Sequence, residues 1–383
     1  MMALKVADRG NLPPFIVMDV MKASAEREAT GADVLHLEVG QPSTSAPKKV
    51  LEAAKLAITN DNLGYTVAFG LPELRERITQ HYKLWYGVDI SIDRVAVTNG
   101  SSAAFILSFM ASFNPGDRVA MVAPGYPAYR NILTALGIET IELQANIEHR
   151  FQPTVSLLKK IKGNIDGLII ASPSNPTGTM IDKRLMEELA NYCEYEGIRL
   201  ISDEIYHGIT YGNTSVSSLE INPQSLVINS FSKYFSMTGW RLGWMIVPDD
   251  LIRPMECLSQ NFFISAPTHS QLAAIAAFDS YDDAEANIKR YARNRSILMN
   301  ELPSAGISNF APADGAFYIY ADVSNLTNSS NKFCKDMLND IGVACTPGLD
   351  FDPLRGDSSI RLSFAGSEAD IIEACKRLRN WLR

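Results

Sequence analysis

The chain has 383 residues, of which 46% are hydrophobic and 20% are charged, a composition typical of a globular protein long enough for two domains. Its formal net charge of −8 argues against wholesale binding to nucleic acid or to an anionic membrane. The five cysteines show no CxxC spacing, so we expect no metal site and no disulfide framework. The N-terminal stretch MMALKVADRGNLPPFIV lacks the pattern of a secretory signal, and we expect a cytoplasmic protein.

Short β-branched runs alternate with helical patterns between residues 90 and 250. The runs expected to form strands, with the turns that follow them, are 94–100, 118–127, 138–143, 167–178, 198–206 and 225–233. Residues 103–113 predict a buried helix, and Asp182 predicts the N-cap of a helix that ends near Tyr195. Because the strands are apolar on both faces, this alternation predicts a mostly parallel sheet covered by helices.

The last hundred residues have a different pattern. Residues 270–302 predict one long helix, rich in Ala at first and in Arg and Lys later. The segments that follow are a strand in 316–323, a helix near 330–341, a strand in 358–364 and a closing helix in 368–382. This order predicts a smaller α+β unit to which the first 40 residues return. We therefore predict a large domain over 45–282 and a small domain over 1–44 and 283–383.

Polar residues stand where several predicted strands end. They are Asn99–Ser102, Tyr126, Asn175, Asp203 with Tyr206, and Ser230 with Lys233. Ligands of parallel α/β sheets bind beyond the carboxyl ends of the strands, at one edge of the sheet. We therefore expect these side chains to form a single site.

Lys233 lies in the stretch SFSKYFSMTGWRLGW, between Phe231 and Tyr234. A lysine in an apolar setting near other cations has a lowered pKa, and its neutral amine can attack a carbonyl carbon. The stretch NGSSAA opens a helix directly after a strand, and such a helix N-terminus attracts phosphate. A buried Asp203 requires a positive partner, which a protonated ring nitrogen would supply. Phosphate, aldehyde and pyridinium in one ligand describe pyridoxal 5′-phosphate.

The ordered motifs SNPTG, DEIY, SFSK and GWRLG resemble those of the class I/II aminotransferases, which depend on pyridoxal phosphate and belong to the aspartate aminotransferase superfamily. The motifs VGQP (39–42), Y-T-x-x-x-G-x-x-x-L-R (65–75), PGYP (124–127) and SIRLSF (359–364) extend the resemblance over nearly the whole chain. It implies fold type I, an α/β architecture whose large domain holds a mostly parallel seven-stranded sheet between helices, beside a smaller α+β domain. A GxGxxG fingerprint is absent from the sequence, so a nicotinamide enzyme is not supported.

The resemblance assigns roles at the cofactor. Lys233 would form the internal Schiff base and then carry the proton, while Asp203 would pair with the pyridine nitrogen. Tyr206 and Asn175 would hydrogen-bond the 3′-oxygen, and Tyr126 would stack on the ring. The groups expected at the phosphate are Gly100, Ser101, Ser102, Ser230, Ser232 and Arg241.

The resemblance also assigns the substrate and the partner. Arg361 would bind the substrate α-carboxylate with a two-pronged contact, helped by the backbone of Gly40 and by Asn175. Tyr65 is similar to the family tyrosine that reaches the phosphate of the partner subunit. We therefore expect a homodimer with shared active sites.

The predicted reaction moves an amino group between an α-amino acid and a 2-oxo acid by a ping-pong Schiff-base mechanism. A C–S β-lyase begins with the same steps, so the motifs leave that alternative open. A transaminase-like regulator without activity is disfavoured, because such proteins carry a basic DNA-binding module and this chain is acidic. The amino donor also stays open. Some acid-specific relatives have a lysine after the phosphate-loop glycines, and Gly100–Ser102 has none. This weakens the case for aspartate without excluding it, since the N-terminal segment or the partner subunit could supply a cation, and neutral or aromatic amino acids are at least as plausible.

Overall fold

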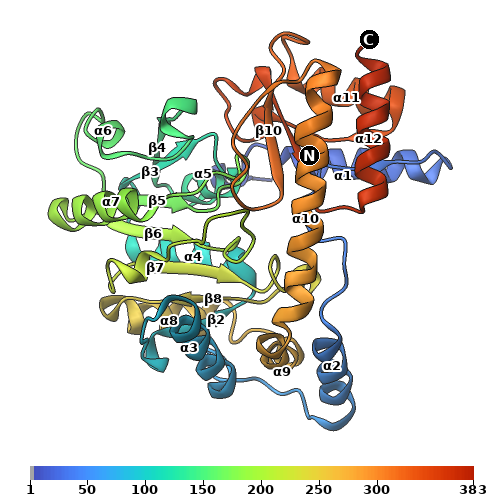
Figure 1. Cartoon of the computed structure of the whole chain (residues 1–383). Helices are drawn as coiled ribbons and strands as arrows, with labels where there is room; N and C mark the ends of the chain where they lie inside the picture. The colour runs from blue at the N-terminus through green and yellow to red at the C-terminus, as the bar shows by residue number, and fades with distance from the viewer. Residues whose placement is uncertain (1–3) are drawn as a thin grey trace.

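A seven-stranded sheet forms the centre of the computed structural model, which describes residues 4–383 (Figure 1). Its strands are β2 (Val95–Thr98), β3 (Arg118–Ala123), β4 (Glu139–Gln144), β5 (Gly167–Ala171), β6 (Arg199–Asp203), β7 (Leu226–Ser230) and β8 (Gly243–Ile246). They lie in the order β2-β8-β7-β6-β5-β3-β4, and only β8 runs antiparallel to its neighbours. The predicted mostly parallel seven-stranded sheet is thus confirmed.

Helices cover both faces of this sheet. Those on one face are α4 (Gly100–Ser112), α5 (Pro127–Ala135) and α8 (Ile252–Phe262), and those on the other include α3 (Pro72–Tyr86), α6 (Val155–Leu158) and α7 (Lys183–Glu196). The side chains of β3 alternate between the two faces, since Val119 and Met121 pack with the first group of helices and Ala120 and Val122 with the second.

The predicted N-cap of α7 is also present, as Asp182 Oδ1 accepts a hydrogen bond of 2.8 Å from Leu185 N.

The C-terminal part holds a second, four-stranded antiparallel sheet in the order β12-β13-β10-β9. Its elements are α10 (Tyr281–Glu301), β9 (Asn309–Phe310), β10 (Tyr318–Asp322), α11 (Ser330–Ile341), β11 (Val343–Ala344), β12 (Thr346–Pro347), β13 (Ser359–Ser363) and α12 (Glu368–Trp381). The N-terminal strand β1 (Leu35–His36) pairs in parallel with β11, so the first residues do return to this part of the chain. One hydrophobic core extends from Leu74 of α3 to Leu378 of α12. The boundaries at 44 and 282 stay a prediction.

The single long helix predicted over 270–302 is wrong. The structure has α9 (Thr268–Ile275), a 3-10 turn (Ala276–Asp279) and then α10. Ser280 separates them, since its φ of −127° is not helical and its hydroxyl donates to the carbonyl oxygen of Ala276 at 2.9 Å. Asp282 and Asp283 then favour a new helix N-terminus.

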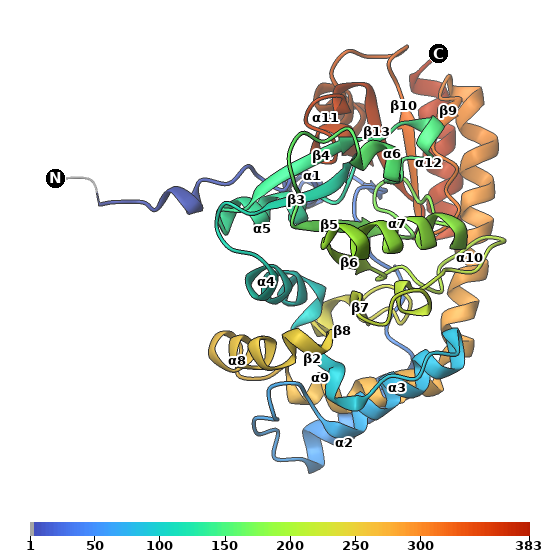
Figure 2. The same ribbon diagram turned by 90° about the vertical axis from the view of Figure 1, so that its left-hand side faces the viewer.

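The remaining elements surround these layers. They are α1 (Ile16–Ala29), α2 (Lys48–Asn60) and the 3-10 helices Asp8–Gly10, Ile92–Arg94, Ile147–His149, Ser218–Glu220, Thr238–Trp240, Asp249–Leu251, Leu302–Ala305, Gly348–Asp350 and Gly356–Ser358. The chain before α1 extends away from the body as an arm (Figure 2). Within residues 4–383 we find no helix with the length and apolarity needed to cross a bilayer.

Helix α1 is held by polar contacts near both of its ends. At its start, Ile16 N and Val17 N donate to the carboxylate of Asp350 at 3.0 and 3.3 Å. Near its end, His36 lies between two carboxylates, with Nε2 3.2 Å from Glu28 of α1 and Nδ1 2.8 Å from the buried Glu38. The hydrogen bond to Glu38, with a smaller effect from Glu28, raises the pKa of His36 to about 9. At neutral pH a charged His36 therefore clamps α1 to the chain segment that follows β1.

Replacing this clamp, His36→Gln, should lower thermal stability in a pH-dependent way. A raised histidine pKa stabilises the fold fully below about pH 6.5, and the contribution disappears as the pH rises through about 9. Because His36 is partly exposed, the loss should be only a few degrees in Tm at pH 6. Scanning fluorimetry from pH 6 to 10 should show the gap to wild type closing. Lys22→Gln, which removes an exposed pair with Glu26 on the same helix, is the control. A gap of constant size would refute the assigned charge.

Candidate active site

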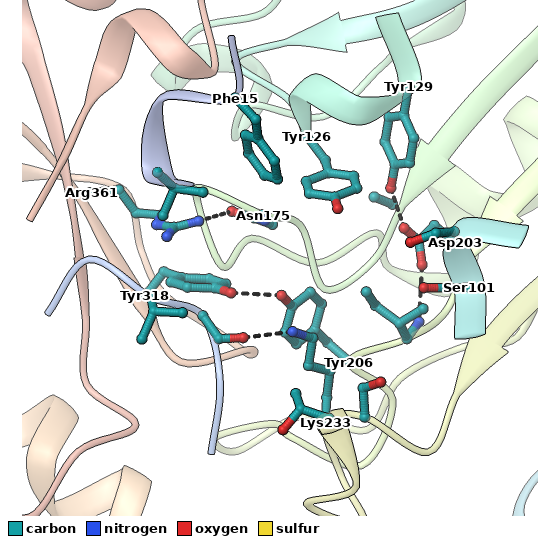
Figure 3. A pocket seen from close by; sticks show the side chains of 18 of the residues that line it. Phe15, Ser101, Tyr126, Tyr129, Asn175, Asp203, Tyr206, Lys233, Tyr318 and Arg361 are labelled. Atoms are coloured by element: carbon teal, nitrogen blue, oxygen red, sulfur yellow. Dashed lines mark hydrogen bonds between the residues drawn. The ribbon is translucent and has the colours of Figure 1, made fainter. Parts of the chain in front are cut away.

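A cavity of about 190 Å³ lies beyond the carboxyl ends of β3, β5, β6 and β7 (Figure 3). The predicted site residues that line it are Gly40, Ser101, Ser102, Tyr126, Asn175, Asp203, Tyr206, Ser232, Lys233, Arg241 and Arg361. They come from segments more than 300 residues apart in sequence. The structure thus brings most of the strand-end residues together at one edge of the sheet, while their roles stay a prediction.

Three predicted residues do not line the cavity. Gly100 lies behind it at φ +74°, where an added Cβ would be 2.6 Å from Nη2 of Arg241, so only glycine lets the guanidinium come so close. Ser230 is buried, and its hydroxyl donates to Ser232 Oγ at 2.9 Å and accepts from Ser232 N at 3.1 Å, which fixes the turn before Lys233. Tyr65 is 84% exposed on the surface.

Lys233 follows β7 in a stretch of buried aromatic residues. Phe231 and Phe235, two residues before and after it, are buried. Its Nζ lies 5.8 Å from the centroid of the Tyr206 ring and donates to the carbonyl oxygen of Gly40 at 2.5 Å. Burial lowers the pKa of this amine to about 8, and the positive charges of Arg361 and Arg241 act in the same direction. An appreciable fraction of Lys233 is therefore a neutral nucleophile near neutral pH.

Asp203 ends β6 and is buried. Its Oδ1 accepts from Ile205 N at 3.1 Å, and its Oδ2 accepts from the hydroxyl of Tyr129. Burial raises the pKa of Asp203 to about 6, while these hydrogen bonds and the charge of Lys233 oppose the rise. Tyr129 is not among the residues predicted from the sequence. Its position three residues after Tyr126 in a helix, on the same face, is the signal that could reveal it.

Arg361 projects from β13 and is buried without an acidic partner. Nη1 donates to Asn175 Oδ1 at 2.9 Å, and Nη2 donates to the carbonyl oxygen of Glu38. The rings of Tyr318 and Phe351 lie 4.4 and 4.8 Å from its Cζ. Among residues 4–383 its Nε has no hydrogen-bond partner, and it takes part in no ion pair. A buried guanidinium with unused donors fits a carboxylate ligand.

Tyr318 is a second site residue that the sequence does not predict. Its hydroxyl lies 2.7 Å from that of Tyr206, and a Cβ added at Gly40 would overlap it. The run AFYIYADV indicates only a strand, and nothing in that pattern shows which aromatic ring faces the cavity. Tyr318 thus connects Tyr206 with the segment that holds the amine of Lys233.

The opposite end of the cavity is suited to an anion. Ser101 and Ser102 stand in the first turn of α4, where free N–H groups and the helix dipole favour negative charge. Arg241 follows at φ +51°, with Nη1 donating to the carbonyl oxygen of Thr238 at 2.9 Å. A cradle for phosphate, an amine of lowered pKa and a buried carboxylate in one cavity fit pyridoxal phosphate.

The remaining wall is apolar and comes from α1 and its flanks. Phe15, Val17, Met18, Met21 and Val39 line it. Phe15 packs edge-on against Tyr126, with ring centroids 5.8 Å apart. The sequence does not place any of these residues in the site, because their contacts join segments that are over 100 residues apart.

Comparison with known proteins agrees with this geometry. The model of the family "Aminotransferase class I and II" matches residues 32–378. The valine–pyruvate aminotransferase of Mycobacterium tuberculosis is 48% identical over 99% of this chain and 98% of its own. A crystal structure of an aminotransferase from the same organism superposes with a TM-score of 0.97 at 48% identity, covering 99% of each chain. Aspartate aminotransferase from Thermus thermophilus with maleate gives 0.93 at 28% identity, covering 99% of this chain and 100% of that one.

The predicted family, fold type and aminotransferase activity are therefore confirmed, and these matches lend no support to the C–S lyase or the regulator. With its sheet, its amine and its anion cradle in the arrangement described, this chain belongs to the class I and II aminotransferases and is a pyridoxal-phosphate-dependent aminotransferase of fold type I.

Proposed function

We propose that this aminotransferase acts on α-amino acids with apolar side chains. The observation that carries the proposal is the charge inventory of the cavity. Among the described residues that line it, the cationic side chains are Lys233, Arg241 and Arg361. Each has one task, at the aldehyde, the phosphate and the α-carboxylate respectively. Within residues 4–383, the lining of the cavity leaves no further cation for the second carboxylate of aspartate or glutamate, whose burial unpaired would be costly.

The apolar wall supports the same proposal. The substrate side chain would extend from the α-carbon toward α1, where Phe15, Met18 and Met21 offer only carbon and sulfur atoms. Methionine adapts its shape to irregular ligands, so this wall suits several branched or straight aliphatic side chains. The similar protein from M. tuberculosis is named a valine–pyruvate aminotransferase, which agrees with an aliphatic donor and a short 2-oxo acid acceptor.

The cofactor roles follow from the same cavity. Ser101, Ser102, Ser232 and Arg241 would hold the phosphate, and Asp203 would face the ring nitrogen. The ring, when bound, supplies an electron sink that stabilises the negative charge left when the substrate α-carbon loses its proton. Tyr126 would cover one face of the ring. Tyr206 and the amide group of Asn175 would reach the 3′-oxygen.

Lys233 would remove and return the proton of the α-carbon. Its pKa of about 8 lies near neutral pH, as efficient general acid–base catalysis requires. The carbonyl of Gly40 orients the amine, and Arg361 would hold the substrate carboxylate so that the α-hydrogen faces Lys233. Tyr318 and Phe351 shield Arg361 from water, which strengthens its attraction for a carboxylate.

We further propose a homodimer in which Tyr65 serves the site of the partner subunit. The loop that carries Tyr65 is held against the α8–α9 connection, since Thr268 Oγ1 donates to Gly64 O at 2.6 Å. Tyr65 and Val67 are exposed on this loop, and Phe262 and Ile264 are exposed at the end of α8 and just after it. Four large apolar side chains exposed on these segments support an interface with a second copy.

The substrate proposal predicts a strong preference among donors. With pyruvate as acceptor, kcat/KM for valine should exceed that for aspartate by at least about a hundredfold, because the aspartate side chain would bury an unpaired charge. The measurement is 2-oxo acid formation by chromatography, with ammonia assayed in parallel. Lys233→Ala, with unchanged circular dichroism, should give no turnover. Equal or better use of aspartate would refute the proposal, and stoichiometric release of ammonia would indicate elimination instead.

The substitution Gly40→Ala should lower kcat/KM by about a hundredfold or more, because the new methyl group displaces Tyr318 and with it the partners of Tyr206 and Lys233. Adding Tyr318→Phe removes the oxygen that overlaps most and should restore part of the activity. Gly366→Ala is the control, since its Cβ would meet nothing within 4 Å. Wild-type kinetics in Gly40→Ala would show that this close approach has no catalytic importance.

Tyr65→Phe should weaken pyridoxal phosphate binding by about tenfold, the loss expected for one charge-assisted hydrogen bond. The wild-type protein should elute at twice the 42.2 kDa of the chain. Mixed dimers of Tyr65→Phe with Lys233→Ala contain one complete site if Tyr65 acts across the interface. They should regain wild-type affinity at that site. A monomer, or mixed dimers without recovery, would contradict the shared site.

A further inference from the structure

We infer that Tyr129 is a positioning residue, whose hydroxyl keeps the carboxylate of Asp203 ionised and aimed at the ring nitrogen of the cofactor. The inference rests on the role proposed above for Asp203. It concerns a hydrogen bond between two residues that both lie inside the protein and that both line the cavity (Figure 3).

Packing fixes the direction of the Tyr129 hydroxyl. The ring is 4% exposed and stands edge-on to Phe105 and to Tyr126, with centroid distances of 4.9 and 5.2 Å. These contacts come from α4 and from the start of α5, so the ring cannot swing away without opening the core. Its hydroxyl donates a hydrogen bond to Asp203 Oδ2. A rigid aromatic scaffold therefore holds a single donor against a single carboxylate oxygen.

The electrostatics of Asp203 depend strongly on this donor. The titratable groups that face Asp203 are the phenols of Tyr126, Tyr129 and Tyr206 and the amine of Lys233. Burial favours the neutral acid, and the Tyr129 hydroxyl is the largest of the effects that oppose it. The pKa of Tyr129 itself is raised well above 10, first by burial and then by Asp203, so the phenol keeps its proton and remains a donor.

Without the Tyr129 hydroxyl, Asp203 would keep only Ile205 N and the charge of Lys233 to offset its burial. Its pKa would then rise toward or above neutrality. A protonated carboxyl group cannot stabilise a protonated ring nitrogen. The loss of the carboxylate would therefore depend on pH, because a sufficiently high pH would ionise Asp203 even without Tyr129.

The test is Tyr129→Phe, which removes one oxygen and keeps the packed ring. Calorimetry would measure pyridoxamine 5′-phosphate binding to the apoprotein from pH 5 to 9, a readout independent of turnover. The loss of a hydrogen bond to a charged acceptor corresponds to about 1 to 2 pKa units. We expect affinity reduced by about 10- to 100-fold near pH 5, below the wild-type pKa of Asp203, by less at pH 7, and approaching the wild-type value by pH 9. The acidic limb of the kcat/KM profile of the holoenzyme should move upward by the same 1 to 2 units.

Two further variants make the result decisive. Tyr281→Phe removes a hydroxyl that is 2.9 Å from His81 Nδ1, outside the cavity, and should leave binding unchanged. In an Asp203→Asn background, Tyr129→Phe should add no pH-dependent loss, since no carboxylate remains to be ionised. A loss of equal size at every pH would mean that Tyr129 only fills space, and no loss would remove it from the site; either result overturns the inference. If instead Asp203→Asn alone binds like wild type, the role proposed for Asp203 has failed.

Discussion

The active site depends on burying two basic side chains and one carboxyl group in one cavity without pairing them with each other. Lys233, Asp203 and Arg361 all line it, and among the described residues none of them forms an ion pair within 4 Å. Each is held by neutral groups: the carbonyl of Gly40, the hydroxyl of Tyr129 and the amide oxygen of Asn175. Hydrogen bonds of this kind make burial of an ion tolerable and leave its charge unneutralised. The cavity is therefore complementary to a ligand that brings a cation, an anion and a carbonyl of its own.

One short segment, residues 37–40, accepts hydrogen bonds from two of these side chains. This segment follows β1 and contacts both β13 and the segment after β7. The carbonyl of Glu38 accepts from Arg361 and from Thr346 Oγ1, and that of Gly40 accepts from Lys233. Leu37 O accepts from Ser363 N at 2.7 Å, which fixes the segment to β13 beside Arg361. The spacing of two residues between Glu38 and Gly40 thus sets the relation between the carboxylate site and the amine.

The sequence predicts the part of the site that comes from local rules. Polar residues at the ends of parallel strands must meet at one edge of the sheet, so strand order alone is enough to bring Asn175, Asp203 and Lys233 together. The sequence does not predict strand β8, because it has only four residues and begins at the last glycine of the motif GWRLG without a turn signal. The sequence also does not predict the helix break at Ser280, because the helix propensity of serine is similar to that of many other residues.

The contacts that the sequence does not predict are those between distant segments. Phe15 meets Tyr126 across 110 residues of chain, and Tyr318 meets Tyr206 across a similar distance. Neither periodicity nor spacing carries information about such pairs, which follow from how α1 and β10 dock. The cofactor end of the site is accordingly easier to predict than the substrate end.

The two ends of the site are carried by different structural elements. The cofactor end is built from the edge of a rigid sheet, where strand register fixes each side chain to its neighbours. The apolar wall is carried by one helix, α1, which is attached through Asp350 at its start and through the His36 clamp near its end. On the proposed function, a substitution on the inner face of α1 would change what the substrate side chain contacts, while the strand-end residues would keep their positions. Selectivity and chemistry would then reside in separate structural elements, so that the same catalytic charges could serve donors of different shape.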